Sequence, residues 1–243
     1  MWTWFHRLAS PPTFYRWGGT LQWIFCVLAV LLIVVGTYGG LVLAPADYQQ
    51  GDAFRIIYVH VPSAWLSLFV YTSMAVAGSV ALIWRMKLAE LYVIAAAPLG
   101  AAFTALALVT GMLWGEPMWG TYWVWDARLT SELVLLFLYL GVIALAAAFE
   151  DPRRGARAAA VLALIGVVNV PIIHYSVEWW NSLHQGATVT KFDSPSITGD
   201  MLWPLLVNAL GFMCYFACLQ CVRMRALILS RERDARWVRE AVA

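Results

Sequence analysis

Six long stretches of the chain are apolar and almost free of charge, and this feature limits the possible folds more than any other. The stretches cover about 21–43, 62–84, 91–114, 129–149, 158–177 and 201–222, and Glu132 is the one Asp, Glu, Lys or Arg residue within them. A helix needs about 20 apolar residues to cross a membrane, so each stretch is long enough. The sequence therefore predicts an all-α polytopic membrane protein, a single domain over 1–243 with six transmembrane helices.

Composition excludes the alternative that these stretches form the core of a soluble protein. Hydrophobic residues make up 62% of the 243 residues and charged residues 12%, whereas a soluble domain is about 25% charged. The apolar run that ends at residue 84 is longer than one span requires. We expect its first part, about Arg55 to Pro62, to lie along the membrane surface before the helix turns inward.

Basic residues are distributed unevenly over the segments that join the helices. With the N-terminus inside the cell, three of the 16 Lys and Arg residues lie outside, namely Arg55, Arg128 and Lys191. Cytoplasmic loops accumulate Lys and Arg, so we expect both termini to be cytoplasmic. The thirteen residues then inside are Arg7, Arg16, Arg85, Lys87, Arg153, Arg154, Arg157, Arg223, Arg225, Arg231, Arg233, Arg236 and Arg239.

The net charge of +2 hides this asymmetry and gives no reason to expect a nucleic-acid partner. The basic tail over 223–239 is interpreted as a segment that faces membrane lipid. Contact between this tail and a partner subunit is the alternative.

The segment between the third and fourth helices is unusually rich in tryptophan. Trp114, Trp119, Trp123 and Trp125 fall within a dozen residues of a short loop that is expected to face outward. One or two such rings are common at a membrane interface, and an interfacial belt is the alternative interpretation here. Pro117 and Gly120 are expected to break the third helix and its continuation, so the loop must form a surface of its own.

A helical turn over 119–126 would place Trp119, Trp123 and Asp126 on one face, at i, i+4 and i+7. The result would be an aromatic shelf with a carboxylate at its edge. Such a shelf suits a large, planar, apolar ligand that also carries polar groups.

Two of the four histidines flank this loop on the expected outer side. His60 lies at the outer end of the second helix, and His184 lies in the last outer loop. His174, in the fifth helix, competes with His184, and the loop position favours His184; His6 is expected to be solvated in the cytoplasmic tail. Neutral imidazole is a usual axial ligand of haem iron, so His60 and His184 are the candidate ligands.

These motifs resemble a known family. The run Trp-Gly-Glu-Pro-Met-Trp-Gly-Thr-Tyr-Trp-Val-Trp-Asp-Ala-Arg over 114–128 is similar to the tryptophan-rich WWD signature of haem-handling proteins. The phrases His60-Val-Pro and His174-Tyr-Ser-Val-Glu-Trp-Trp-Asn-Ser-Leu-His184 narrow the match. From about Phe5 to Arg239 the chain resembles the haem exporter protein C family of cytochrome c maturation system I.

The resemblance implies a bacterial inner-membrane protein that carries haem b as cargo on the periplasmic side and delivers it to the haem chaperone, protein E. It implies an export complex with an ATP-binding subunit, a membrane subunit and a small subunit, which are proteins A, B and D of the same system. The family's two outer histidines correspond to His60 and His184. Its haem platform corresponds to Trp114, Trp119, Trp123, Trp125 and Asp126.

The chain itself is not expected to be an enzyme. It contains no Gly-x-x-x-x-Gly-Lys-Ser/Thr motif, so ATP hydrolysis by a P-loop is expected in a partner subunit.

Cations on the outer side are candidates to bind the haem propionates. Arg128 adjoins the expected aromatic shelf and is the first candidate, and Arg55 is the second. The alternative for Arg128 is an i, i+4 ion pair with Glu132.

The first outer loop carries Asp47 and Gln50, which have no evident use in haem burial. We interpret them as residues that dock the chaperone, with a solvated connector as the alternative. Two other classes of function also stay open. One is a b-type electron carrier with two histidine ligands, and the other is a permease or scaffold subunit that binds no haem.

Overall fold

The computed structural model describes residues 10–242 apart from 187–188, 190 and 192–193. His6 and Arg7 therefore lie outside the described residues. The described chain is helical, without a strand; one isolated bridge pairs Asp47 with Gly51. Its elements are α2 (Pro11–Tyr38), the π-helical turn η1 (Gly39–Leu43), the 3-10 helix η2 (Asp52–Ile56), α3 (Ile57–Trp84), α4 (Lys87–Trp119), α5 (Ala127–Ala147), α6 (Pro152–Gly166), α7 (Asn169–Trp179), α8 (Gly199–Arg231) and α9 (Arg236–Val242).

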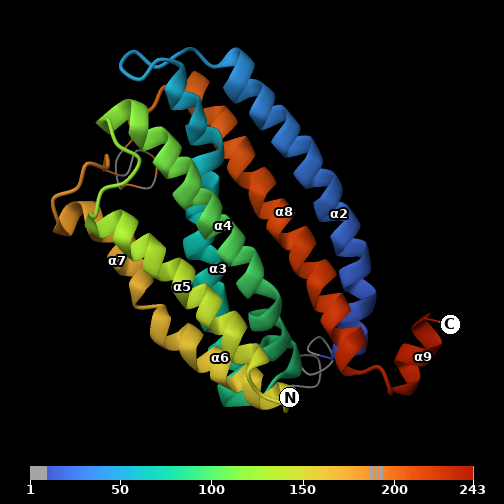
Figure 1. Ribbon diagram of the computed structural model, residues 1–243. Helices are drawn as coiled ribbons and strands as arrows, with labels where there is room; N and C mark the ends of the chain where they lie inside the picture. Colours follow the sequence, from blue (N-terminus) through green and yellow to red (C-terminus); the bar gives the residue numbers. More distant parts are fainter. Residues whose placement is uncertain (1–9, 187–188, 190, 192–193, 243) are drawn as a thin grey trace.

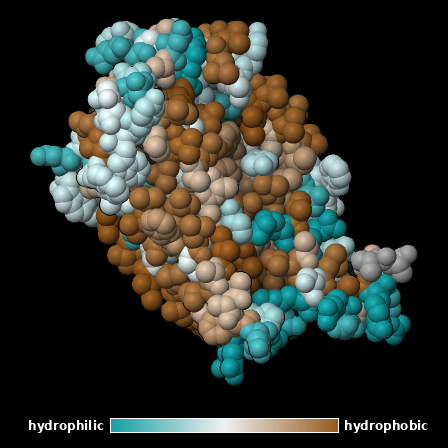
Figure 2. Space-filling model, in the orientation of Figure 1, coloured by the Kyte–Doolittle hydropathy of each residue, from teal (hydrophilic) through white to brown (hydrophobic). Residues whose placement is uncertain are grey.

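Six helical segments are long and apolar enough to cross a membrane within the part of the chain that is described, which confirms the predicted fold class. They run up and down between two ends of the molecule (Figure 1). We call one end, with residues 44–60, 114–128, 174–186 and 194–198, the histidine end. We call the other, with residues 85–87, 148–157 and α9, the arginine end. Hydrophobic residues cover most of the middle of the face shown in Figure 2, and hydrophilic residues gather mainly towards its ends.

The start of α3 differs from the prediction of a surface segment over 55–62. The helix begins at Ile57 and continues through Pro62, directly after η2. Pro62 removes one backbone hydrogen bond near the helix start, which packing of the first turn can offset. Ile57 and Tyr58 are buried in that turn, in a cluster with Ala44, Met201 and Leu205.

The fifth span consists of two helices, α6 and α7, where the sequence predicts one helix over 158–177. The interruption follows Gly166. Pro171 has no N–H to donate to the carbonyl of Val167. That carbonyl instead accepts a hydrogen bond from the N–H of Val170, at 3.0 Å, which tightens the chain into a turn.

Helix α8 lies between α2 and the pair formed by α3 and α4. Helix α2 packs almost entirely on α8, and α8 in turn contacts α3 and α4 (Figure 1). Small residues allow α2 and α8 to approach closely, since a Cβ at Gly36 would lie 2.8 Å from the Asn208 side chain. Helices α5, α6 and α7 cover the other side of the α3–α4 pair.

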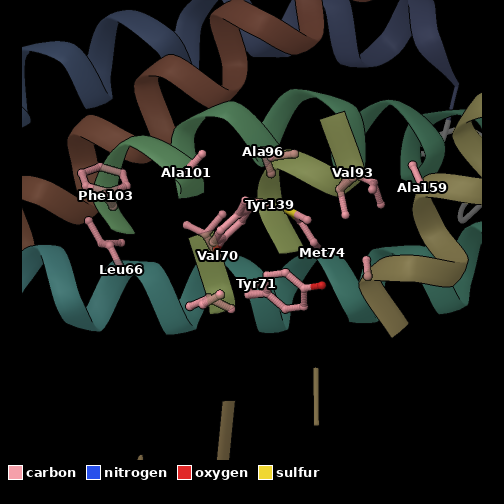
Figure 3. Packing of buried hydrophobic residues seen from close by; sticks show 14 of the residues in the cluster. Leu66, Val70, Tyr71, Met74, Val93, Ala96, Ala101, Phe103, Tyr139 and Ala159 are labelled. Carbon is pink, nitrogen blue, oxygen red and sulfur yellow. The ribbon is translucent and has the colours of Figure 1, made fainter. Parts of the chain in front are cut away.

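The main core lies between α3, α4, α5 and α6. Figure 3 shows side chains of α3 and α4 facing one another, with Tyr139 of α5 between them. The Tyr139 ring contacts the Tyr71 ring edge-on, with centroids 5.0 Å apart. Its hydroxyl donates to the carbonyl oxygen of Ser67 at 2.7 Å, so a polar group in the apolar interior is satisfied.

Gly100 of α4 makes room for this tyrosine. A Cβ at Gly100 would lie 2.2 Å from the Tyr139 ring, so Gly100→Ala should force the ring out of its place. Overpacking of this kind costs about 1–3 kcal/mol, and we expect a lower melting temperature for the purified variant in detergent. Gly199→Ala is the matched control, since nothing lies within 4 Å of a Cβ there. Equal melting temperatures for the two variants would contradict this description of the core.

Candidate functional site

The last three turns of α4 carry the centre of the candidate site. The helix continues through Pro117 and ends at Trp119, so the prediction that Pro117 breaks it is wrong. Proline removes only one N–H here. The helix ends at the other predicted breaker, Gly120, which takes a left-handed φ of 72°. Residues 121–126 are not helical, and the expected helical face shared by Trp119, Trp123 and Asp126 does not form.

His60 lies against this part of α4. Its Nδ1 is 3.0 Å from the hydroxyl oxygen of Thr110. A Cβ at Gly111 would lie 3.0 Å from the imidazole Cε1, so the absence of a side chain there allows the ring to lie close to the helix. The edge of the ring also contacts Trp114, with centroids 5.6 Å apart.

His184 reaches the same helix from the last loop. Its ring contacts Trp119 with centroids 4.7 Å apart, and the Trp119 ring lies over Gly115, where a Cβ would be 3.0 Å away. Gly111 and Gly115 are four residues apart, so they lie on one face of α4. This face therefore holds His60 directly and His184 through Trp119. The two imidazoles are near enough to interact electrostatically.

Asp126 holds His184 in place, and both of its carboxylate oxygens have partners within the protein. Oδ1 accepts the backbone N–H of Leu129 at 2.8 Å and thereby caps the start of α5. Oδ2 accepts the hydroxyl of Ser182 and lies 2.9 Å from Nδ1 of His184. The Asp126 side chain is 5% exposed and that of His184 16% exposed, so the pair is shielded from water.

The protonation states of this pair follow from its surroundings. Burial opposes ionisation of Asp126, but hydrogen bonds from Ser182, the Leu129 backbone and His184 lower its pKa below the usual value. Burial lowers the pKa of His184, and this effect outweighs the attraction of Asp126. At pH 7 the pair is therefore a carboxylate beside a neutral imidazole, the form that can bind a metal.

The four tryptophans of the WWD segment do not form one flat shelf. Trp114 and Trp119 each contact a histidine, whereas Trp123 and Trp125 contact one another edge-on, with centroids 5.2 Å apart. Trp125 is 75% exposed. The indole N–H of Trp123 is buried and has no partner among the described residues, so it can donate to a ligand.

Arg128 forms its hydrogen bonds with α7. Among the described residues it makes no ion pair within 4.0 Å with Glu132, the alternative prediction, although the two charges attract one another. Its Nε donates to the Ser176 hydroxyl at 3.1 Å, and Nη2 donates to the carbonyl of His174 at 3.3 Å. These contacts hold the guanidinium beside the site. Its charge acts on both His60 and His184.

Arg55 has a structural task that the sequence did not indicate. Its Nη1 donates to the carbonyls of Gly40 and Ala44 at 2.7 and 3.0 Å, and its Nε pairs with Asp52 at 2.9 Å. It therefore caps the C-terminal end of the first span, where a cation is favourable. The structure ties its guanidinium to these partners and favours Arg128 as the cation beside the site.

The two residues expected to dock a partner also have partners within the chain. Asp47 accepts the backbone N–H groups of Gln49 and Gln50 at 2.9 and 2.8 Å and so stabilises its own turn. The Gln50 side chain accepts the indole N–H of Trp114 at 2.9 Å. Gln50 therefore supports the site from the first loop.

Sequence reasoning missed Thr110 and Ser182, which contact the two histidines. The spacing of Gly111 and Gly115 was the available signal, since two glycines four residues apart mark a helix face that something approaches closely. His174 is exposed in α7, where its ring contacts Tyr175.

The lowered pKa of His184 gives a direct test of this geometry. The imidazole in the purified protein without added ligand should titrate below its usual value of 6.5, because burial disfavours the cation. The unfolded chain takes up this proton more readily, so stability should fall as the pH drops through 6.5. Nitrogen NMR of labelled histidine follows the titration, with the denatured protein as the control. A midpoint at or above 6.5 in the folded protein would contradict the burial of His184.

Known proteins match this chain over almost its whole length. The family model described as Heme exporter protein C matches residues 4–239. Heme exporter protein C of Haemophilus influenzae is 54% identical over 239 residues, which cover 98% of this chain and 97% of the relative. The Escherichia coli K12 protein of that name is 55% identical over 243 residues, covering 100% and 98%. The chain therefore belongs to the heme exporter protein C family.

Proposed function

We propose that this protein binds haem b as cargo between His60 and His184 and delivers it to a haem chaperone, protein E, for c-type cytochrome maturation. One observation carries the proposal. Both imidazoles lie along one face of α4, and each uses Nδ1 within the protein. The names of the relatives, which describe a heme exporter, support the same conclusion.

The residues at the histidine end fit the chemistry of haem. Haem iron is bound by four porphyrin nitrogens and has two axial positions, which two neutral imidazoles can fill. Trp114 and Trp119, beside the two imidazoles, offer apolar surface to the porphyrin at about 25 cal/mol per Å² removed from water. The free N–H of Trp123 and the cation of Arg128 are suited to the propionates.

The distribution of charge supports a periplasmic site in the bacterial inner membrane. Lys and Arg residues concentrate in the loops and tail of the arginine end, which we place in the cytoplasm with both termini. The histidine end then faces the periplasm. A chaperone on that side would meet the exposed Trp125 and the first loop, where Asp47 stays our candidate for docking and Tyr48 is 90% exposed.

We propose that the protein works in an export complex with an ATP-binding subunit, a membrane subunit and a small subunit, proteins A, B and D of the maturation system. The chain has no P-loop motif, so ATP would be hydrolysed by the ATP-binding subunit and not by this chain. The role of this chain is to hold haem and present it.

The ligand pair is tested by absorption spectra of purified variants. His60→Ala and His184→Ala should each abolish or shift the Soret and α bands, because each removes an axial ligand. His174→Ala should largely keep them, since this side chain is exposed and contacts Tyr175. Loss of haem from His174→Ala together with retention by His184→Ala would contradict the assignment.

A second test concerns Trp119, which lies between His184 and α4. Trp119→Ala removes an aromatic contact worth about 0.5–1.5 kcal/mol beyond its buried area, and it releases His184 from the helix. We expect at least a several-fold loss of haem per folded molecule, measured by pyridine haemochrome assay. Trp23→Ala is the matched control, because Trp23 is 68% exposed on α2. Equal haem content in both variants would indicate that Trp119 only anchors the bundle.

A further inference from the structure

Each imidazole of the proposed ligand pair has a protein partner at Nδ1. The partner of His60 is the hydroxyl of Thr110, and the partner of His184 is the carboxylate of Asp126. The His60 ring also interacts with the backbone carbonyl of Ala107, and the Ser182 hydroxyl oxygen lies 3.2 Å from Nδ1 of His184. Among the described residues, the hydrogen bonds with a stated ring nitrogen are all at Nδ1. The nature of each partner decides which nitrogen carries the proton.

Thr110 can only accept a hydrogen bond from His60. A hydroxyl has one proton to donate, and the Thr110 oxygen lies 2.6 Å from the carbonyl of Leu106, one turn earlier in α4. With that proton committed to the helix backbone, the contact with His60 requires a proton on Nδ1. The lone pair of His60 then lies on Nε2.

Asp126 imposes the same tautomer on His184. A carboxylate has no proton to donate, so the 2.9 Å contact requires a proton on Nδ1 of His184. Ser182 strengthens the arrangement, because its hydroxyl donates to the same Oδ2 and its oxygen accepts the backbone N–H of His184 at 3.1 Å. The loop and the ring are thus fixed by one carboxylate.

We propose that Thr110 and Asp126 are positioning residues that hold His60 and His184 in the Nδ1–H tautomer and keep both Nε2 lone pairs free for iron. This inference rests on the proposed function. Iron binds the nitrogen that has a lone pair, and the group on the other nitrogen sets the orientation of the ring. Asp126 thus acts through His184 and not as part of the haem platform.

Two substitutions remove these constraints with little change in shape. Thr110→Val removes the hydroxyl acceptor of His60 and leaves the backbone carbonyl of Ala107 in place. Asp126→Asn leaves one side-chain oxygen in place of two; if that oxygen keeps the bond to Leu129, the amide N–H₂ faces His184. The amide then favours the tautomer of His184 with its proton on Nε2. A protonated Nε2 has no lone pair and cannot bind iron. Asn caps a helix as well as Asp does, so α5 should still start normally.

The experiment measures haem retained per folded molecule and the absorption spectrum, with and without added imidazole. Loss of an outer partner of a metal ligand typically costs about 10–100-fold in affinity, and we expect this loss for Thr110→Val and for Asp126→Asn. Millimolar imidazole should restore a spectrum with two nitrogen ligands, since it replaces the wrongly presented ring. Thr110→Ser keeps the acceptor and should retain more haem than Thr110→Val.

Matched controls separate positioning from folding. Thr104 is in the same helix as Thr110, and its hydroxyl donates to the carbonyl of Gly100 at 2.8 Å and contacts no histidine. Thr104→Val removes that hydroxyl. Asp151→Asn changes the cap of α6, at the arginine end, where the carboxylate accepts the N–H of Arg153 at 2.9 Å. Both should retain haem like the wild type and need no imidazole.

Two results would overturn the inference. One is an unchanged haem content and spectrum for both Thr110→Val and Asp126→Asn. The other is a loss of haem from Thr110→Val and Asp126→Asn that imidazole does not reverse, although imidazole does restore haem binding to His60→Gly and His184→Gly. Wild-type protein without haem, or His60→Gly and His184→Gly variants with the wild-type spectrum, would instead refute the proposed function itself.

Discussion

A polar group without a partner in the hydrocarbon of a membrane costs several kcal/mol, and the rest of this structure depends on that cost. It requires the spanning segments to be helices whose backbone groups pair internally. It also leaves the ends of the bundle as the places where charge can gather. Asp126 and Arg128 accordingly stand at the start of α5, beside the end of α4. The Tyr139 hydroxyl shows how a polar group in the interior is satisfied, since it donates to the carbonyl oxygen of Ser67.

The six spans could be predicted from sequence because an apolar run of about 20 residues seldom forms anything but a membrane-spanning helix. The ends of the helices could not. Pro62 and Pro117 both lie inside helices. The hydrogen bond lost at Pro62 is offset by burial of Ile57 and Tyr58. The hydrogen bond lost at Pro117 lies close to the end of α4. Pro171 does coincide with a break, so a proline alone does not decide.

The residues of the candidate site could be named from the sequence, but their arrangement could not. His60, His184, Trp119 and Asp126 belong to motifs that resemble a haem-handling family. Nothing local shows that Asp126 contacts a histidine 58 residues later. Arg55 illustrates the same limit, since its partners Gly40 and Ala44 are backbone carbonyls, which no side-chain pattern reveals.

We propose that one haem iron is bound by Nε2 of both His60 and His184, on the face of α4 that contains Gly111 and Gly115. The most direct measurement is a cryo-electron microscopy structure of the purified, haem-loaded protein in its complex. The account predicts a planar macrocycle at the histidine end, with density joining the iron to both Nε2 atoms and Nδ1 of His184 still bonded to Asp126. A haem bound through His174, or one whose iron contacts neither His60 nor His184, would contradict it.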